Sequence, residues 1–174
     1  MKQTISLAII MMLAISGVFA KDNKAGANKP VTAKGTNISV TYEQPSKNGR
    51  VIFGKPEDNP VMAYGKVWDV PAAQITFTKD CLVGGNKRQL KAGTYSVFIR
   101  PAQGEWIFIF NSQPKLTNAA DLEKNKDKTI LQTWGLTKKL DNVVEAFTIT
   151  PQKDGLLVEW DQSSVLFPVE FVGK

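Results

Sequence analysis

Two apolar runs joined by a short polar linker, in the stretch TYSVFIRPAQGEWIFIFN at residues 94–111, constrain the fold more than any other part of the chain. Side chains alternate between the two faces of a strand, and here both faces are apolar: Val97 and Ile99 face one way and Phe98 the other. The linker at residues 101–104 has the Pro and Gly chemistry of a hairpin. We therefore expect a central β-hairpin that is covered on both sides, by a second sheet below and by a loop or helix above.

Alternating apolar and polar side chains predict further strands on either side of this hairpin. Apolar residues recur at every second position, as in half-buried strands, around residues 38–42, 74–78, 147–149, 156–160 and 165–171. Lys153-Asp154-Gly155 has the sequence of a tight hairpin turn. Pro168 favours an edge position for the last strand, because proline donates no ladder hydrogen bond.

Residues 117–128 break the strand pattern. They are rich in Ala and Lys, with Asn118 as an N-cap and Asp121 in the first turn, and predict a short surface helix or an ordered loop. About eight short strands with at most one short helix indicate an all-β fold. We expect an antiparallel β-sandwich with a jelly-roll-like arrangement, in preference to a squashed barrel.

The N-terminal part of the chain predicts export. Residues 1–20 combine Lys2, an apolar run and small residues ending at Ala20, which is the pattern of a secretory signal peptide. The apolar run is shorter than the roughly 20 residues that span a bilayer, which disfavours the alternative of an uncleaved anchor. Residues 21–35 are small and polar and predict a flexible N-terminal segment. Residues 36–174 are then a single β-sandwich domain of an exported protein, periplasmic or extracellular, without a membrane span after signal cleavage.

The charge and the cysteine content of the chain bear on nucleic-acid binding and on disulfide bonds. The chain has 22 Lys and Arg against 16 Asp and Glu, and the basic residues are scattered instead of forming a stripe along one strand or helix. A scattered charge of this size indicates solubility and gives no reason to expect nucleic-acid binding. The lone Cys81 excludes an internal disulfide, and its apolar neighbours favour a small buried side chain over a reactive thiol.

The chain contains no histidine. This excludes Ser-His and Cys-His nucleophile pairs and removes the commonest metal ligand and neutral-pH base. No Gly-rich phosphate loop is present. We therefore expect no catalytic residues of these kinds, no metal and no cofactor, and we favour a protein that is not an enzyme.

Paired carboxylates are the one catalytic arrangement that remains open. A glycosidase-like hydrolase needs two such groups about 5–10 Å apart in one concave site. The acids near predicted strands are Glu43, Asp69, Glu105, Glu145 and Glu159. Because 16 acids will supply some such pair by chance, this pattern alone identifies no site.

Glu145 has the period of an inward-facing residue, since it shares a face with Phe147 and Ile149. A buried carboxylate needs a partner, and the chain has only three arginines, of which Arg50 and Arg100 lie at strand ends. One hypothesis is a structural ion pair between Glu145 and Arg50 or Arg100 at the rim of the fold. The alternative is that Glu145 begins its strand and is simply exposed to water.

Two tryptophans fall where loops are expected. Trp68 follows Tyr64-Gly65-Lys66, and Trp134 precedes a glycine after a polar stretch. Exposed loop aromatics often form ligand platforms, so Arg50, Tyr64, Trp68 and Trp134 are candidate binding residues. The alternative is that these rings close one open end of the fold. Trp106 and Trp160 lie within strand patterns and are predicted core residues.

Six segments in order resemble one family of exported bacterial proteins, the domain of unknown function 2911. They are TYEQPSKNGRVIFG (41–54), YGKVW (64–68), GGNKRQLKAGTYSVFIRP (84–101), EWIFIFN (105–111), WG (134–135) and VEAFTI (144–149). The resemblance implies export and an all-β fold, and it carries no activity. After YGKVW the family pattern continues with Arg and a Gly-Ala-Asn-Glu-like stretch, whereas this chain has Asp69 and Pro71-Ala72-Ala73. A family site in that loop would be altered here.

Two functions are consistent with these features. The first is an exported, non-catalytic protein that binds carbohydrate or another cell-envelope component through an end-loop patch. The second is the carboxylate-dependent hydrolase. A purely structural or partner-binding envelope protein has the same sequence features as the first.

Overall fold

The structure, a computed structural model, describes residues 30–68 and 73–173 and is mostly β with one short helix. The strands are β1 (Pro30–Gly35), β2 (Ile38–Glu43), β3 (Phe53–Gly54), β4 (Met62–Ala63), β5 (Ala73–Phe77), β6 (Cys81–Val83), β7 (Arg88–Leu90), β8 (Gly93–Pro101), β9 (Glu105–Asn111), β10 (Thr129–Gln152) and β11 (Gly155–Phe171). The helix α1 spans Ala119–Lys124, and single 3₁₀ turns lie at Pro56–Asp58 and Lys126–Lys128. The predicted all-β class with one short helix is confirmed.

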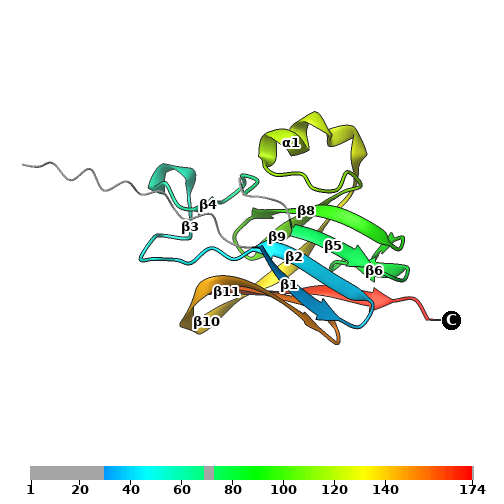
Figure 1. The fold of residues 1–174 in the computed structure, drawn as a ribbon. Helices are drawn as coiled ribbons and strands as arrows, with labels where there is room; N and C mark the ends of the chain where they lie inside the picture. Colours follow the sequence, from blue (N-terminus) through cyan, green and yellow to red (C-terminus); the bar gives the residue numbers. More distant parts are fainter. Residues whose placement is uncertain (1–29, 69–72, 174) are drawn as a thin grey trace, which may run out of the picture.

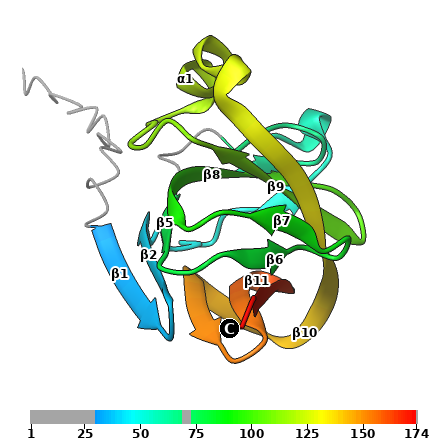
Figure 2. The ribbon, with the colours of Figure 1, turned by 90° about the vertical axis from the view of Figure 1, so that its right-hand side faces the viewer.

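Nine of the strands form one sheet in the order β1-β2-β5-β8-β9-β10-β11-β6-β7, and every neighbouring pair is antiparallel. The short strands β3 and β4 form a separate parallel pair. The large sheet curves so that β10 and β11 lie beneath β5, β8 and β9, while α1 lies above β8 (Figure 1). Seen from the side, β6 and β7 continue the sheet beyond β11 (Figure 2).

The predicted sandwich of two separate sheets is not confirmed, because the sheet is continuous. The cause is the length of β10, which has 24 residues and changes partner along its course. It pairs with β9 over residues 129–136 and with β11 from Thr137 onward. Register shifts between Lys139 and Thr148 interrupt the second pairing, and irregularities of this kind let a strand bend.

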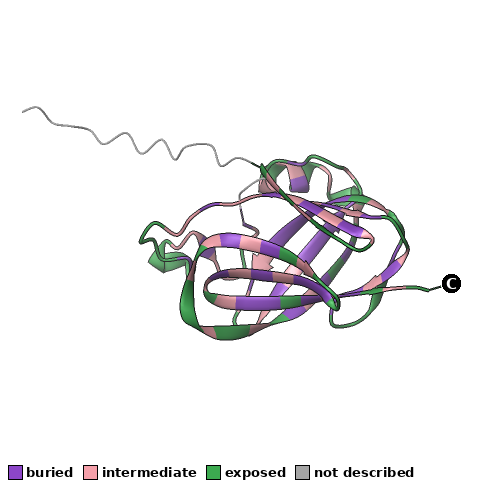
Figure 3. Ribbon diagram, turned by 60° about the horizontal axis from the view of Figure 1, so that its bottom comes forward, coloured by how far each residue is buried: buried purple, intermediate pink, exposed green. Residues whose placement is uncertain are grey.

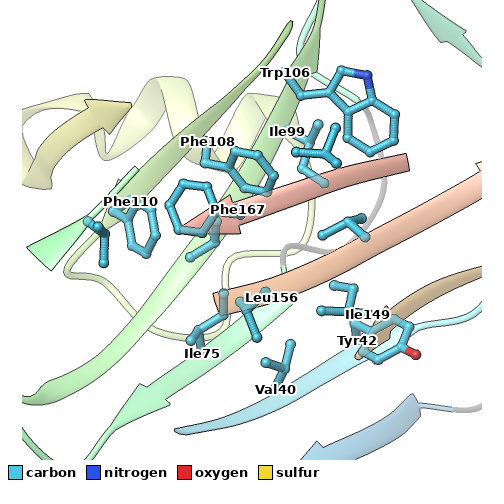
Figure 4. Close-up of a cluster of buried hydrophobic side chains, with 14 of the residues drawn as sticks. Val40, Tyr42, Ile75, Ile99, Trp106, Phe108, Phe110, Ile149, Leu156 and Phe167 are labelled. Atoms are coloured by element: carbon cyan, nitrogen blue, oxygen red, sulfur yellow. The ribbon is translucent and has the colours of Figure 1, made fainter. Parts of the chain in front are cut away.

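The apolar core fills the space inside this curved sheet. Strands alternate between buried and exposed residues, most visibly along β10 and β11 (Figure 3). Phe108 of β9 and Phe167 of β11 meet across the core with ring centroids 4.2 Å apart (Figure 4). Trp106 and Trp160 are buried, as predicted, with 1% and 0% of their surfaces exposed.

The central hairpin predicted for residues 94–111 is confirmed as β8 and β9. One face enters the main core, and the other buries Phe98 and Ile109 under Leu116 and Leu122 in a second cluster. The helix that supplies Leu122 begins where predicted. The Asn118 side chain accepts a hydrogen bond of 2.8 Å from the main-chain N–H of Asp121.

Two sequence predictions about the chain ends need correction. Residues 30–35, assigned to the flexible segment 21–35, form strand β1, because their main chain pairs with β2 and Val31 packs against the core. The last strand is not at an edge, since β11 lies between β10 and β6. Pro168 is tolerated there because it falls between the pairing with β10, which ends at Val165, and the pairing with β6, which starts at Val169.

The signal peptide predicted for residues 1–20, and residues 21–29, lie outside the described residues. Within the part of the chain that is described, no helix is long and apolar enough to cross a membrane. Cys81 is fully buried, as predicted, and burial raises the pKa of its thiol to about 11.

Candidate binding site

Trp68 is a core residue and offers no exposed ring. Only 7% of its surface is exposed, and its ring centroid lies 5.0 Å from that of Phe147 and 5.3 Å from that of Trp160. Its main-chain N–H donates to the Ile99 carbonyl, which fixes the segment against β8. In the predicted patch of Arg50, Tyr64 and Trp68, this leaves the half-buried Tyr64 as the aromatic residue that can reach the surface.

Arg50 completes the turn that precedes it. Its Nε donates to the Lys47 carbonyl at 3.0 Å and its Nη2 to the Ser46 carbonyl at 2.5 Å. Asn48 and Gly49 have positive φ angles of 49° and 71°, so this turn points main-chain carbonyls toward the guanidinium. An arginine at the start of an apolar segment is explained by these two carbonyls.

Glu145 holds the same turn from the other side. Its Oε1 accepts from the Asn48 main-chain N–H at 2.7 Å, and its own carbonyl accepts from the Trp160 indole at 3.2 Å. Arg100 instead donates to the Gln132 amide at 3.4 Å. Among the described residues, neither arginine forms an ion pair with Glu145. An ion pair near this turn instead joins Lys47 and Asp161 at 2.9 Å, and the sequence did not predict it.

Trp134 lies in strand β10 and not in a loop. It is half-buried, and its carbonyl accepts a hydrogen bond from the Gly85 N–H at 2.9 Å. A Cβ built on Gly85 would overlap the indole ring, and one built on Gly84 would overlap the Thr133 side chain. The two glycines let the turn after β6 approach β10 this closely. Both glycines also line a hollow on the surface, which is the candidate site described next.

Two hollows flank the tight turn between β10 and β11. The first, with a volume of about 420 Å³, lies between this turn and the end of β6, and its lining includes Gly84 and Gly85. The second, of about 520 Å³, lies between the same turn and the turn that joins β1 and β2. Lys153 and Phe171 line both hollows, and we call the two together the turn groove. The turn between β10 and β11 lies at the end of the molecule where the C-terminus emerges (Figure 1).

The lining of the turn groove is mixed in chemistry. Leu82, Val169 and Phe171 give the first hollow apolar surface. Pro151 and Phe171 do the same for the second, beside the hydroxyl of Thr36 and the amide of Gln152. Apolar surface with a few polar groups is typical of small-ligand sites.

The charged groups of the turn groove are unevenly distributed. In the first hollow, Lys87 Nζ lies 2.9 Å from Glu170 Oε2, and Asp154 adds a second carboxylate. In the second hollow Lys153 is the only charged residue of the described lining. Lys153 forms no ion pair within residues 30–68 and 73–173. The groove therefore combines the Lys87–Glu170 pair with the unpaired ammonium of Lys153 and, in the first hollow, the carboxylate of Asp154.

Metal binding finds no support in the arrangement of side chains. Within the described ranges, no group of three or more Cys, Asp or Glu residues is placed to hold a metal ion. The first hollow does contain two carboxylates, Asp154 and Glu170, although neither was among the acids singled out from the sequence. No pattern in the sequence brings these two acids together, because their proximity depends on the far end of β11 returning to this turn, where the Val169 N–H donates to the Asp154 carbonyl at 3.1 Å.

The fold and the groove define a class: a mostly β protein, free of histidine, whose architecture fits a non-catalytic role. The chain belongs to the family described as protein of unknown function (DUF2911), whose sequence model matches residues 24–169. The resemblance found in the sequence is thereby confirmed. The comparison with curated proteins found no match, and neither did the comparison with solved structures. The family departure at residues 69–73 falls largely on residues 69–72, which lie outside the described part of the chain.

Proposed function

We propose that this protein is exported to the periplasm or the cell exterior and there binds a carbohydrate or another cell-envelope component without catalysing a reaction. The leader pattern of residues 1–20 supports export. The single observation that carries the binding function is the turn groove, with its apolar and hydrogen-bonding lining in hollows of about 420 and 520 Å³.

The chemistry of the groove suits a sugar. A pyranose presents apolar C–H faces and a rim of hydroxyl groups, so it needs apolar surface and polar groups side by side. Phe171 and Pro151 supply the first, and Thr36, Gln152 and Lys153 supply the second. The lining of the turn groove supports the end-loop binding role better than Arg50, Tyr64 and Trp68 do, because the Trp68 ring is buried.

A glycan array with purified protein tests this proposal. The double variant Gln152→Ala/Lys153→Ala should lose most of the binding signal, because it removes two polar groups from the groove lining. The matched control is Gln103→Ala/Lys66→Ala, which changes an exposed amide and an exposed amine elsewhere on the surface. Equal loss in both double variants, or no binding by the wild type to any glycan, would remove the proposal.

A hydrolase is the second candidate, because Asp154 and Glu170 line the same hollow. It is weaker, since the Glu170 carboxylate is already paired with Lys87 and both acids are exposed. Assays on a panel of glycosides with Asp154→Asn and Glu170→Gln would decide. A hydrolase requires turnover by the wild type that both variants abolish.

A further inference from the structure

We infer that the turn groove takes an acidic glycan, a sugar chain that carries carboxylates; this rests on the binding function proposed above. The second hollow provides the first argument. Among the described residues that line it, Lys153 alone is charged, and the other polar side chains, those of Thr36 and Gln152, are neutral. A carboxylate placed there meets an ammonium that no described carboxylate already neutralises.

The surroundings of the second hollow are cationic as well. Lys34 directly precedes Gly35 of the lining, and Lys79 directly follows Thr78, whose N–H and hydroxyl both donate to Asn37 of the β1–β2 turn. Like Lys153, these two lysines are exposed and form no ion pair in the described part of the chain. Three free ammonium groups near one end of the molecule favour an anionic ligand over a neutral one.

The acids at this end do not cancel that charge. Asp80 accepts from Lys91 at 2.8 Å and from the Ala92 N–H at 2.9 Å, and these two hydrogen bonds hold the pKa of Asp80 below its usual value. Glu170 is paired with Lys87. Asp154 lines only the first hollow. The second hollow is therefore where an added carboxylate meets the least repulsion.

Shape favours a sugar chain over a small anion. Two hollows adjoin on either side of Lys153, and each is large enough for at least one sugar ring. Phe171 lines both and gives apolar surface to rings on either side of the turn. A chain crossing the turn would place its carboxylate in the second hollow and a neighbouring unit in the first.

Calorimetry with three polyuronates, polygalacturonate, alginate and polyglucuronate, each beside its methyl ester, tests this inference. At least one free acid should bind, and its ester, which has the same backbone and no charge, should bind on the order of tenfold more weakly. Lys153→Gln should lower the affinity for the acid by a similar factor and leave the ester unchanged. Raising the salt concentration from about 0.05 to about 0.3 M should weaken the binding of the free acid and leave the binding of the ester unchanged. The control Lys66→Gln removes an exposed lysine on the segment bonded to Pro101, at the opposite end of β8.

The outcomes separate this inference from the proposed function. Equal affinity for acid and ester, or a Lys153→Gln variant that binds like the wild type, overturns the acidic ligand and leaves a neutral sugar site. Binding of neutral glycans on the array without binding of any polyuronate likewise overturns the acidic ligand and leaves a neutral sugar site. Binding to anionic phospholipid vesicles in place of polyuronates also overturns it. An array with no bound glycan at all overturns both.

Discussion

The Glu145 carboxylate accepts a 2.7 Å hydrogen bond from the main-chain N–H of Asn48, 97 residues earlier in the chain. The bond ties β10 to a turn that Arg50 closes through the Ser46 and Lys47 carbonyls. Glu145 and Arg50 thus act on one turn without pairing with one another. The contact is a charge-assisted hydrogen bond at the surface, so its contribution is modest.

Glu145→Ala should lower the free energy of unfolding by about 1 kcal/mol, because the Asn48 N–H loses its acceptor and gains only water. Glu123→Ala is the control, since Glu123 is exposed and its one ion pair within the described ranges is with the nearby Lys126. Urea unfolding of both variants measures the difference. Equal, negligible losses in the two variants would mean that the Glu145 side chain is exposed to water and contributes nothing to stability, which is the alternative that the sequence left open.

Replacing Trp68 should lower the stability of the protein, as expected for a core residue and not for an exposed binding residue. Its ring is buried against Phe147 and Trp160, so Trp68→Ala should destabilise the protein by about 3–5 kcal/mol. Trp68→Phe keeps most of the apolar volume and should cost clearly less. Chemical denaturation followed by circular dichroism measures both variants. A stable, well-folded Trp68→Ala protein would contradict the buried placement.

The features that could be predicted from the sequence are those set by neighbouring residues. The two-sided apolar pattern of residues 94–111 specifies a hairpin buried on both faces, and Asn118 specifies where α1 begins. Both follow from the local geometry of a strand or a helix end. Neither requires knowledge of which distant segment packs on top.

The features that could not be predicted depend on distant partners. Trp68 follows a turn-like sequence, but the rings that bury it belong to residues 147 and 160. The single continuous sheet depends on β10 exchanging β9 for β11 along its length. The turn groove forms where separate hairpin turns meet, so the turn at Lys153-Asp154 was predictable and the hollows beside it were not.

Gly85→Ala should destabilise the protein by about 1–3 kcal/mol, because the added methyl group overlaps the Trp134 ring. The loss should shrink when Trp134→Ala is combined with it, and the double-mutant cycle measures this coupling. Gly173→Ala is the control, since a Cβ there meets no atom of the described, non-adjacent residues within 4 Å. Additive losses would mean that the turn after β6 does not rest on this ring.

Cys81 should be unreactive in the folded protein. It is fully buried, and burial raises the pKa of its thiol to about 11, so almost no thiolate is present at neutral pH. Labelling with a thiol reagent at pH 8 should follow the rate of unfolding and should become fast in denaturant. Fast labelling without denaturant would show that β6 opens locally.

The pair Asp80 and Lys91 should make stability depend on pH at both extremes. The Lys91 side-chain hydrogen bond, together with the Ala92 N–H, lowers the pKa of Asp80 from its ordinary value of 3.8. A depressed carboxyl pKa gives stability that is present above 3.8 and is lost as the pH falls through the lower folded value.

The same hydrogen bond raises the pKa of Lys91 above its ordinary value of 10.5, so that contribution is complete below 10.5 and is lost as the pH rises through the higher folded value. The free energy of unfolding, measured against pH in wild type and Asp80→Asn, should therefore converge toward both ends and differ most in between. Lys126 pairs with Glu123, whose side chain is 72% exposed against 38% for Asp80, so Glu123→Gln controls for loss of a fully exposed acid near a lysine. A depressed Asp80 pKa makes the wild type lose stability more steeply than Asp80→Asn as the pH falls below 3.8. If the difference in the free energy of unfolding between the two proteins did not shrink there, the depressed pKa would be contradicted.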